Sequence, residues 1–389
     1  MTKVLKIILL IAPMRAFDRG LLQGIACYAN EYGPWTFYRE PPHYQSVSWK
    51  KKFSDRLRTG QIDGIIMREP EKINEIINSK IPGIAAPVKK RLIEGFINII
   101  TDSDAVAYMG AKHLLDCGLR NFAYCGFKGM YWPIDRGKAF QKYIIKAGYQ
   151  CDIYEPKPLI GTKALLEEEL PYLVDWLKSL PKPVGIMAYN DDRSRHILDA
   201  CNIANIHVPS QVAIIGVDND EFICRPVTPQ LSSISMDPGS LGYKAARLLD
   251  QLMAGKKCRD TVIVGKPTHV VARSSTDILL VEDREISQAV RFIREHADQP
   301  LQVIDVAEGV AMSIRNLQQR FHKATGCYVH SHIERVRVDR IVQLLMETDL
   351  KIEQIANQLH FSSRKQLERV FTRVMGVTAS SYRLQHRIN

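Results

Sequence analysis

The sequence lacks any long hydrophobic run. In 389 residues no apolar stretch approaches the roughly 20 residues that a membrane-spanning helix needs. The apolar segment 7–12, which follows Lys3 and Lys6, is similar to the start of a signal peptide. It is too short for one, however, and Pro13 follows where small cleavage-site residues are expected. We therefore interpret it as the buried first strand of a parallel sheet and expect no membrane association.

Cysteine is also scarce. The eight cysteines include no C-x-x-C pair, which excludes the common zinc-ribbon and thioredoxin-type motifs. Their number is too small for a disulfide scaffold in a chain of this length. We therefore expect reduced cysteines in a cytoplasmic protein, with no metal site and no cofactor.

The remaining composition is that of a globular protein, with 46% hydrophobic and 24% charged residues. A chain of this length is expected to form two or three domains. The net charge of +11 favours a polyanionic partner without identifying it. From the pattern along the chain we expect one domain at 1–277, a linker at 278–285 and a second domain at 286–389.

Residues 4–277 alternate between short apolar runs and amphipathic helical patterns, which predicts parallel sheets covered by helices. The predicted strands are 4–12, 64–67, 83–86, 97–100, 122–126, 184–188 and 212–217. The predicted helices are 18–31, 104–117, 137–147, 163–179, 192–204 and 239–254.

Polar and aromatic residues follow five of these strands. In parallel α/β sheets, ligands bind outside the carboxyl ends of the strands. Carboxylates, amides and arginines form paired hydrogen bonds, and aromatic rings stack on the apolar face of a sugar. Each acid by itself could equally cap the following helix, but five clusters at one sheet edge favour a sugar site. The candidates are Phe17, Asp18, Arg19, Asp102, Trp132, Arg136, Asn190, Asp191, Asp218 and Asn219.

The runs 99–102, 188–191 and 215–219 resemble the core of LacI-type regulators and periplasmic sugar-binding proteins. This resemblance implies a two-lobed α/β fold that closes on a small ligand, with chain crossings near 101–104 and 231–237. It also implies sugar contacts by Arg136, by Asn190 or Asp191, and by Asp218. Asp102 could equally lie at the hinge.

The last 100 residues contain only helical patterns and a weak internal repeat. In each copy a short helix with a small alanine is followed by a turn, a serine and a second helix. The buried positions of that second helix are Leu317 and Phe321 in the first copy, and Leu367 and Phe371 in the second. This pattern predicts two helix-turn-helix units joined by a long helix at 328–347. A helical bundle with ordinary charged faces is the alternative.

The second helix of each unit exposes side chains that can read base edges in a major groove. They are Arg315, Asn316, Gln318 and Gln319 in the first unit, and Arg364, Lys365, Glu368 and Arg369 in the second. The segment resembles the AraC-family DNA-binding domain, through Ser313, Gly326, the run 335–337, the run 376–378 and Tyr382 among others. It departs from that family at His360, where glycine is usual, at Leu367 and at Ala379.

A sugar-binding domain followed by an AraC-type domain resembles the xylose-operon regulators. The resemblance implies a cytoplasmic, homodimeric activator that binds promoter DNA and responds to D-xylose or a related pentose. The alternatives are a regulator that responds to another monosaccharide and acts as a repressor, a transport-type sugar-binding protein, or a sugar-processing enzyme. The last is disfavoured because the sequence shows no nucleophile motif and no phosphate loop.

Overall fold

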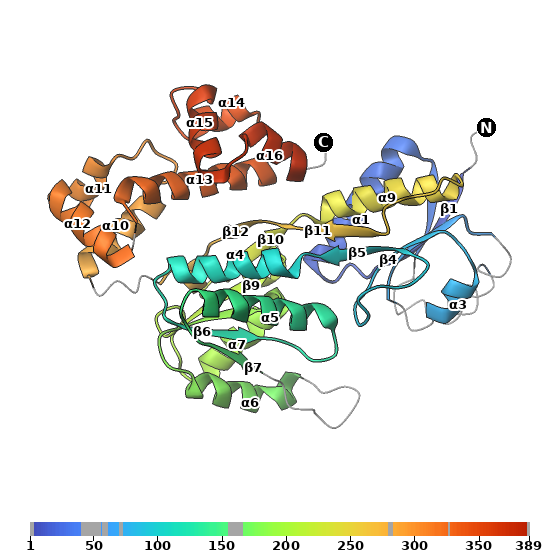
Figure 1. The fold of residues 1–389 in the computed structure, drawn as a ribbon, viewed down its shortest axis with the longest axis horizontal. Helices are drawn as coiled ribbons and strands as arrows, with labels where there is room; N and C mark the ends of the chain where they lie inside the picture. The colour runs from blue at the N-terminus through green and yellow to red at the C-terminus, as the bar shows by residue number, and fades with distance from the viewer. Residues whose placement is uncertain are drawn as a thin grey trace.

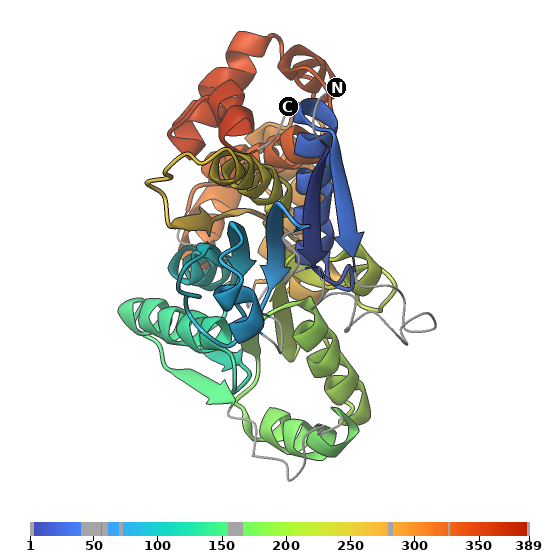
Figure 2. The ribbon, with the colours of Figure 1, turned by 90° about the vertical axis from the view of Figure 1, so that its right-hand side faces the viewer.

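The computed structural model describes residues 4–39, 56, 61–69, 73–154, 166–278, 283–325 and 327–386. These residues form two α/β lobes and one all-helical domain (Figure 1). The predicted fold class is confirmed. Viewed after a quarter turn, the helical domain lies at one end of the molecule and α6 (Leu166–Ser179) of the second lobe at the other (Figure 2).

Lobe one contains a parallel sheet whose described strands have the order β11-β5-β4-β3-β1-β2. Its elements are β1 (Leu5–Leu10), α1 (Ala16–Tyr32), β2 (Trp35–Arg39), β3 (Gly64–Arg68), α3 (Ile73–Asn78), β4 (Gly83–Ala86), β5 (Ile97–Thr101), α9 (Pro238–Met253) and β11 (Val262–Gly265).

Helices α1 and α9 lie backbone to backbone in lobe one, although they are far apart in the sequence. Glycines permit this approach. A Cβ atom added to Gly24 would lie 1.9 Å from the carbonyl oxygen of Gly239, and one added to Gly242 would lie 2.1 Å from that of Leu21. No side chain fits at either position, so the pairing of these two helices depends on glycine.

Lobe two contains a sheet of order β12-β10-β9-β8-β6-β7, in which only the pairing of β10 with β12 is antiparallel among the described strands. Its elements are α4 (Ser103–Asp116), β6 (Asn121–Cys125), α5 (Tyr131–Lys146), β7 (Cys151–Tyr154), α6, β8 (Val184–Ala188), α7 (Asp191–Ile203), β9 (Val212–Val217), α8 (Glu221–Cys224), β10 (Ser232–Met236), β12 (Pro267–Val271) and the 3-10 helix η2 (Ser274–Thr276).

Three described segments cross between the lobes. They connect β5 to α4, β10 to α9, and β11 to β12. The first two lie where the sequence predicts crossings. The third, at 265–267, was not predicted. The crossings are joined to one another, because the Asp102 N–H donates to the Gly265 carbonyl at 2.8 Å and Met236 pairs with Pro267.

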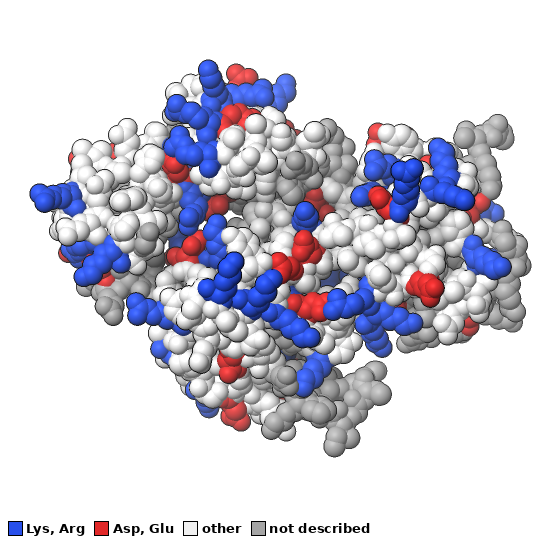
Figure 3. Space-filling model, in the orientation of Figure 1, with Lys and Arg blue, Asp and Glu red and all other residues white. Residues whose placement is uncertain are grey.

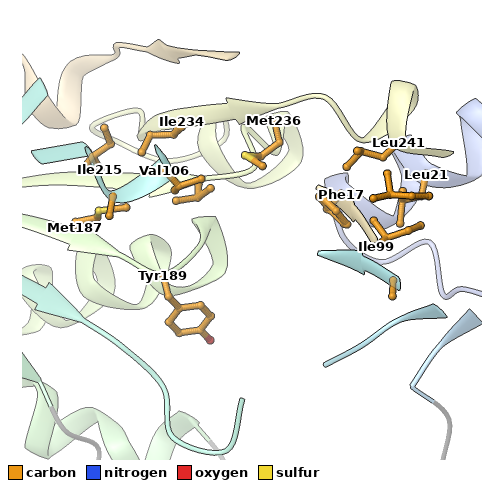
Figure 4. Packing of buried hydrophobic residues seen from close by; sticks show 14 of the residues in the cluster. Phe17, Leu21, Ile99, Val106, Met187, Tyr189, Ile215, Ile234, Met236 and Leu241 are labelled. Carbon is orange, nitrogen blue, oxygen red and sulfur yellow. The ribbon is translucent and has the colours of Figure 1, made fainter. Parts of the chain in front are cut away.

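One hydrophobic cluster extends through both lobes along these crossings. Figure 4 shows Phe17, Leu21, Ile99 and Leu241 on the lobe-one side, with Val106, Met187, Ile215 and Ile234 on the lobe-two side. Met236 lies between the two groups in this view. The lobes therefore share buried contacts at the hinge, and separate clusters cover the other faces of the two sheets.

The helical domain consists of α10 (Arg284–Glu295), α11 (Val303–Gly309), α12 (Ile314–Thr325), α13 (Val329–Glu347), α14 (Ile352–Gln358), α15 (Arg364–Met375) and α16 (Ala379–His386). It has two hydrophobic clusters. One joins α10, α11 and α12 to the start of α13, and the other joins the rest of α13 to α14, α15 and α16. The long helix α13 therefore belongs to both halves.

The structure differs from the predicted elements in several places. Helix α5 begins at Tyr131, so Trp132 and Arg136 lie in its first turns rather than in a loop. Strands β2, β7, β11 and β12 were not predicted, and β10 was predicted only as a crossing. Residues 163–165 of a predicted helix and 279–282 of the predicted linker lie outside the described residues. Helix α10 begins at Arg284, and the division into 1–277, 278–285 and 286–389 stays a prediction.

Candidate functional site

The segments that follow the strands of the two lobes face each other, and polar contacts connect them. Among the described residues these contacts are Arg15 Nε to Asp192 Oδ2 at 3.2 Å, Arg19 Nη2 to Asp220 Oδ1 at 2.6 Å, Ala16 N to Asp220 Oδ2 at 2.9 Å and Arg91 Nη2 to Asp135 Oδ1 at 2.5 Å. The carboxyl ends of the two sheets therefore lie on opposite sides of one interface. The predicted site residue Arg19 acts there as a bridge between the lobes.

On the lobe-one side, Asp18 and Arg68 form a fixed pair. Asp18 lies in the first turn of α1 and is 8% exposed. Its Oδ1 accepts from Arg68 Nε at 2.7 Å and lies 2.6 Å from Arg68 Nη2. The same guanidinium lies 5.4 Å from the centre of the Phe17 ring. Phe17, Asp18 and Arg68 thus form one charged and aromatic group at the end of β3.

On the lobe-two side, Arg136 is almost fully buried near the start of α5. Its Nη1 donates to the Tyr189 carbonyl, and its guanidinium lies 5.1 Å from the centre of the Trp132 ring. Its Nε is buried and has no hydrogen-bond partner among the described residues. Burial lowers the pKa of Arg136. An unpaired buried donor is costly, so this Nε is a candidate for a ligand contact.

Asp218 follows β9 and has a left-handed backbone with a φ of 101°. Burial raises the pKa of its carboxyl to about 6, although Arg136, Arg15 and Arg68 all favour the charged form. Within the described residues no donor forms a hydrogen bond with this carboxylate. Asp218 and Arg136 therefore present an acceptor and a donor from lobe two toward Asp18 and Arg68 of lobe one.

Asp102 and Asn190 cap helices. The Asp102 carboxylate accepts from the Ala105 N–H at 3.0 Å at the start of α4, and Asn190 Oδ1 accepts from the Arg193 N–H at 3.0 Å at the start of α7. Asp102 also lies at the first crossing between the lobes. Asn190 Nδ2 also donates to Asp192 Oδ2 at 3.0 Å. A sugar contact by Asn190 stays a prediction, because the amide nitrogen carries a second hydrogen.

Asp191 and Asn219 have other partners in lobe two. Asp191 accepts from the Ser233 hydroxyl at 2.6 Å and from the Asp220 N–H at 2.7 Å, and burial raises its pKa well above the usual value. The Asn219 side chain accepts from Arg273 Nη2 at 2.7 Å. These bonds connect elements inside the lobe, so we do not carry either residue into the proposed sugar site.

Neither Arg68 nor Arg15 was predicted from the sequence. Arg68 is the last residue of β3, and a charged residue at the end of a buried strand is the same signal that identified the other candidates. Arg15 directly precedes α1 and its importance depends on Asp192, a residue of the other lobe. Pairing across lobes leaves no local pattern in the sequence.

The helical domain contains two helix-turn-helix units, α11–α12 and α14–α15. Both turns have the same hydrogen bonds. The N–H of Met312 donates to Ala307 O, and the N–H of Phe361 donates to Ala356 O, each at 2.8 Å. Between them, Ala311 and His360 have left-handed backbones with φ of 53° and 54°. The departure from glycine at His360 therefore leaves the turn intact.

The predicted anchors of the second helices, Leu317, Phe321, Leu367 and Phe371, are all fully buried. Ser363 caps α15 by accepting from the Gln366 N–H at 3.2 Å, while Gln366 Oε1 accepts from Ser362 rather than from Ser363. Ser363 and Gln366 thus form a capping box only in part.

The predicted base-reading side chains are exposed, except Glu368, which is partly buried. Glu368 accepts from the Ala379 N–H at 2.7 Å and from the Ser380 hydroxyl at 3.0 Å, at the start of α16. Arg364 Nη2 lies 3.3 Å from the Ser380 hydroxyl oxygen. Basic side chains gather over α14 and α15 at the top of the view in Figure 3. Because both Glu368 oxygens already accept hydrogen bonds, a base contact by this residue would require them to change.

Within the described part of the chain, no group of three or more His, Cys, Asp or Glu side chains could hold a metal ion. No helix in the same residues is long and apolar enough to span a membrane.

Two family models match the chain. A periplasmic binding protein-like domain matches residues 111–276, and a helix-turn-helix domain matches residues 306–385.

The chain is similar along nearly its whole length to several known regulators. It is 31% identical to a xylose operon regulatory protein of Haemophilus influenzae, over 97% of this chain and 98% of that protein. It is 28% identical to a xylose operon regulatory protein of Escherichia coli strain K12, over 98% of this chain and 97% of that protein. Among solved structures, it is similar to the xylose-binding transcription activator XylR, with a TM-score of 0.60, 28% identity and full coverage of both chains.

Proposed function

This chain belongs to the family of xylose operon regulatory proteins and is a DNA-binding transcriptional regulator, and we propose that D-xylose or a related pentose is its effector. Membership of a family of regulators confirms the prediction that the chain is not an enzyme. We further propose that it acts in the cytoplasm, as a homodimer and as an activator.

The observation that carries the effector proposal is the pair Asp218 and Arg136. The Asp218 carboxylate lacks a hydrogen-bond donor among the described residues, and the buried Arg136 Nε lacks an acceptor. Adjacent sugar hydroxyls both donate and accept, so one pentose supplies what each of these groups lacks. The rings of Trp132 and Phe17 offer apolar surfaces from lobe two and lobe one.

Sugar binding at this interface favours the closed arrangement of the lobes. Asp18 and Arg68 belong to lobe one, whereas Asp218 and Arg136 belong to lobe two. A ligand that contacts both pairs binds the closed arrangement more tightly than the open one, and it therefore shifts the equilibrium toward closure. In the proposed activator, the closed arrangement is the one that promotes transcription.

The proposed DNA contacts are made by the exposed residues of α12 and α15. Two units joined by the continuous helix α13 can enter successive major grooves about 34 Å apart. Arg315 and Arg364 are the residues that we expect to contact bases, followed by Gln319 and Arg369. Arginine forms a bidentate pair with guanine in the major groove.

A thermal-shift and calorimetric panel tests the effector. D-xylose, D-ribose, L-arabinose and D-glucose are each added to the full chain, and D-xylose is expected to stabilise it most. At a hundred times the Kd, the stabilisation is about 2.7 kcal/mol. A stronger thermal shift or tighter binding with a hexose would identify that hexose, rather than D-xylose, as the effector.

The same panel with Asp218→Ala tests the site. Loss of a charged hydrogen-bond partner is expected to cost about 1.5–3 kcal/mol of sugar binding, while sugar-free DNA binding persists. Asp199→Ala is the control, because Asp199 forms an exposed ion pair on α7 away from the lobe interface. Unchanged sugar affinity in Asp218→Ala would show that the site is misplaced.

Lower DNA occupancy or transcription on adding the sugar would indicate a repressor.

A further inference from the structure

The helical domain is docked on lobe two through a buried hydrogen bond. The hydroxyl of Tyr382, in α16, donates to the carbonyl of Thr268, in β12, at 2.6 Å. Tyr382 is 5% exposed, and its ring lies edge-on to Phe371 of α15, with 5.6 Å between the ring centres. The hydrogen bond therefore connects lobe two directly to the packing of the second helix-turn-helix unit.

Ion pairs extend the same interface toward the first unit. Arg335 Nη1 of α13 lies 3.0 Å from Asp116 Oδ2 at the end of α4, and Arg294 Nη1 of α10 lies 2.8 Å from Asp277 Oδ1. Figure 1 shows α13 lying alongside β12 and α4, and contacts between α13 and β12 confirm this arrangement. Helices α10, α13 and α16 thus contact lobe two, while the predicted base-reading residues of α12 and α15 other than Glu368 stay exposed.

The contact point on lobe two lies at the hinge. Thr268 follows Pro267, the residue at which the third crossing enters lobe two. The Thr268 hydroxyl donates to the Ser235 carbonyl at 3.1 Å, just before the second crossing. A rotation of the lobes changes backbone angles at these crossings, one peptide away from the carbonyl that Tyr382 binds.

We propose that this docking interface couples the lobe arrangement to the second helix-turn-helix unit within a single chain. The proposal rests on the proposed function, because sugar must first change the lobe arrangement. The docked position of α13 and α16 differs in free energy between the two lobe arrangements, since the Thr268 carbonyl moves with the hinge. Sugar then alters the orientation of α15 relative to α12 within one chain, and no contact between protomers is needed.

Linked titrations of the full chain test this coupling. The Kd of sugar is measured with and without saturating operator DNA, and the ratio of the two values is the coupling factor, which must be the same for the reciprocal titration. Tyr382→Phe keeps the ring and removes the hydroxyl, and Asp116→Asn removes the charge that pairs with Arg335. Each variant is expected to bring the ratio about two- to tenfold closer to one.

The chain offers matched controls for both variants. Tyr28→Phe removes the hydroxyl of a tyrosine that is also 5% exposed, and this hydroxyl donates to Asp250 at 3.0 Å within lobe one. Asp199→Ala breaks an ion pair with Arg195 whose exposure is close to that of Arg335 and Asp116. Both controls are expected to keep the wild-type ratio.

The outcomes separate this proposal from the proposed function. If the double variant Tyr382→Phe with Asp116→Asn keeps the coupling factor of the wild-type chain, the coupling route is overturned, even if sugar and DNA both bind. If the wild-type chain itself has a coupling factor of one, coupling is overturned altogether. Failure of the wild-type chain to bind any pentose would instead refute the effector. If Tyr382→Phe fails to fold, the Asp116→Asn variant, changed at an exposed residue, still tests whether the docking interface carries the coupling.

Discussion

Asp218 and Asn219 are consecutive residues with positive φ, 101° and 50°, and neither is a glycine. Such backbone conformations carry strain and persist only where the surroundings hold them. Here the Asp218 N–H donates to the Ile234 carbonyl at 2.9 Å, and the Asn219 N–H donates to the Ser233 hydroxyl at 2.9 Å. Because of this strained turn, the Asp218 side chain points to the lobe interface, and the Asn219 side chain binds Arg273 in the segment that leads to the helical domain.

The pKa of Asp218 predicts a pH dependence of sugar affinity. Burial raises this pKa to about 6 in the sugar-free protein. Sugar hydroxyls that donate to the carboxylate favour its ionised form, so binding lowers the pKa and releases a proton when the pH is below about 6. Affinity is therefore expected to be constant above about pH 7 and to fall at lower pH, by at most tenfold per unit for one proton.

Calorimetry at pH 5.5, 6.5 and 7.5 measures this dependence. Asp218→Asn is the control, because an amide does not titrate and its weaker affinity is expected to vary little over the same range. An equally steep fall in Asp218→Asn would assign the titration to another group.

At the scale of single elements, the left-handed residues in the two helix-turn-helix turns, Ala311 and His360, have a conformational strain energy that glycine would remove. A left-handed backbone costs about 1–2 kcal/mol for a residue with a Cβ atom. Replacing Ala311 with glycine relieves this, against an entropic cost of about 0.5–1 kcal/mol. Ala311→Gly is therefore expected to stabilise the first unit by up to about 1 kcal/mol, and His360→Gly the second by a similar amount.

Hydrogen exchange of amides in 303–325 of the full chain measures the effect at Ala311. Ala324→Gly is the matched control, since Ala324 is exposed in α12 and glycine there is expected to destabilise the helix by about 0.5–1 kcal/mol. Equal destabilisation by the two substitutions would contradict the left-handed turn.

Helix α15 supplies a prediction about DNA sequence preference. Arg364→Ala is expected to weaken binding by about 1–3 kcal/mol and to relax the preference at one base pair of the operator. Binding to a library of single-base operator variants measures this, with Arg195→Ala on the surface of lobe two as the control. A uniform loss across the library would identify Arg364 as a phosphate contact.

Elements with a strong local pattern were predictable from the sequence. The apolar runs at β4, β8 and β9 and the amphipathic pattern of α13 lie within one residue of the observed bounds. Strand β10 was not predicted as a strand because its buried residues include Ser232 and Ser233. These serines bond to Arg273 O and to Asp191, partners that a local pattern does not show.

The site was predictable only in part for the same reason. A polar residue after a strand has the same appearance in the sequence whether it caps a helix, as Asp102 does, or has no hydrogen-bond donor among the described residues, as is true of Asp218. The role of Arg19 depends on Asp220, which is remote in the sequence. Long-range pairing separates these cases, and it becomes visible only in the folded chain.

For the whole molecule, we predict a homodimer with four helix-turn-helix units. Sedimentation of the protein with operator DNA is expected to show two chains for each operator. Footprinting with and without D-xylose is expected to show a change in the protected region or in affinity, because closure alters the relative position of the units. A single chain at saturation would contradict the dimer, and identical footprints and affinities with sugar bound would contradict the switch.

Lobe one is built from two separate segments of the chain, and this affects the order in which the parts of the protein fold during synthesis. Helix α1 leaves the ribosome early, but its partner α9 begins only at Pro238, after strands β6 to β10 of lobe two. At about 5–20 residues per second, the apolar face of α1 waits on the order of 10–40 s for the helix that covers it. Lobe two, nested between the halves of lobe one, can become compact first. The nascent chain is therefore most exposed to aggregation and to chaperones through α1, until Gly24 contacts Gly239.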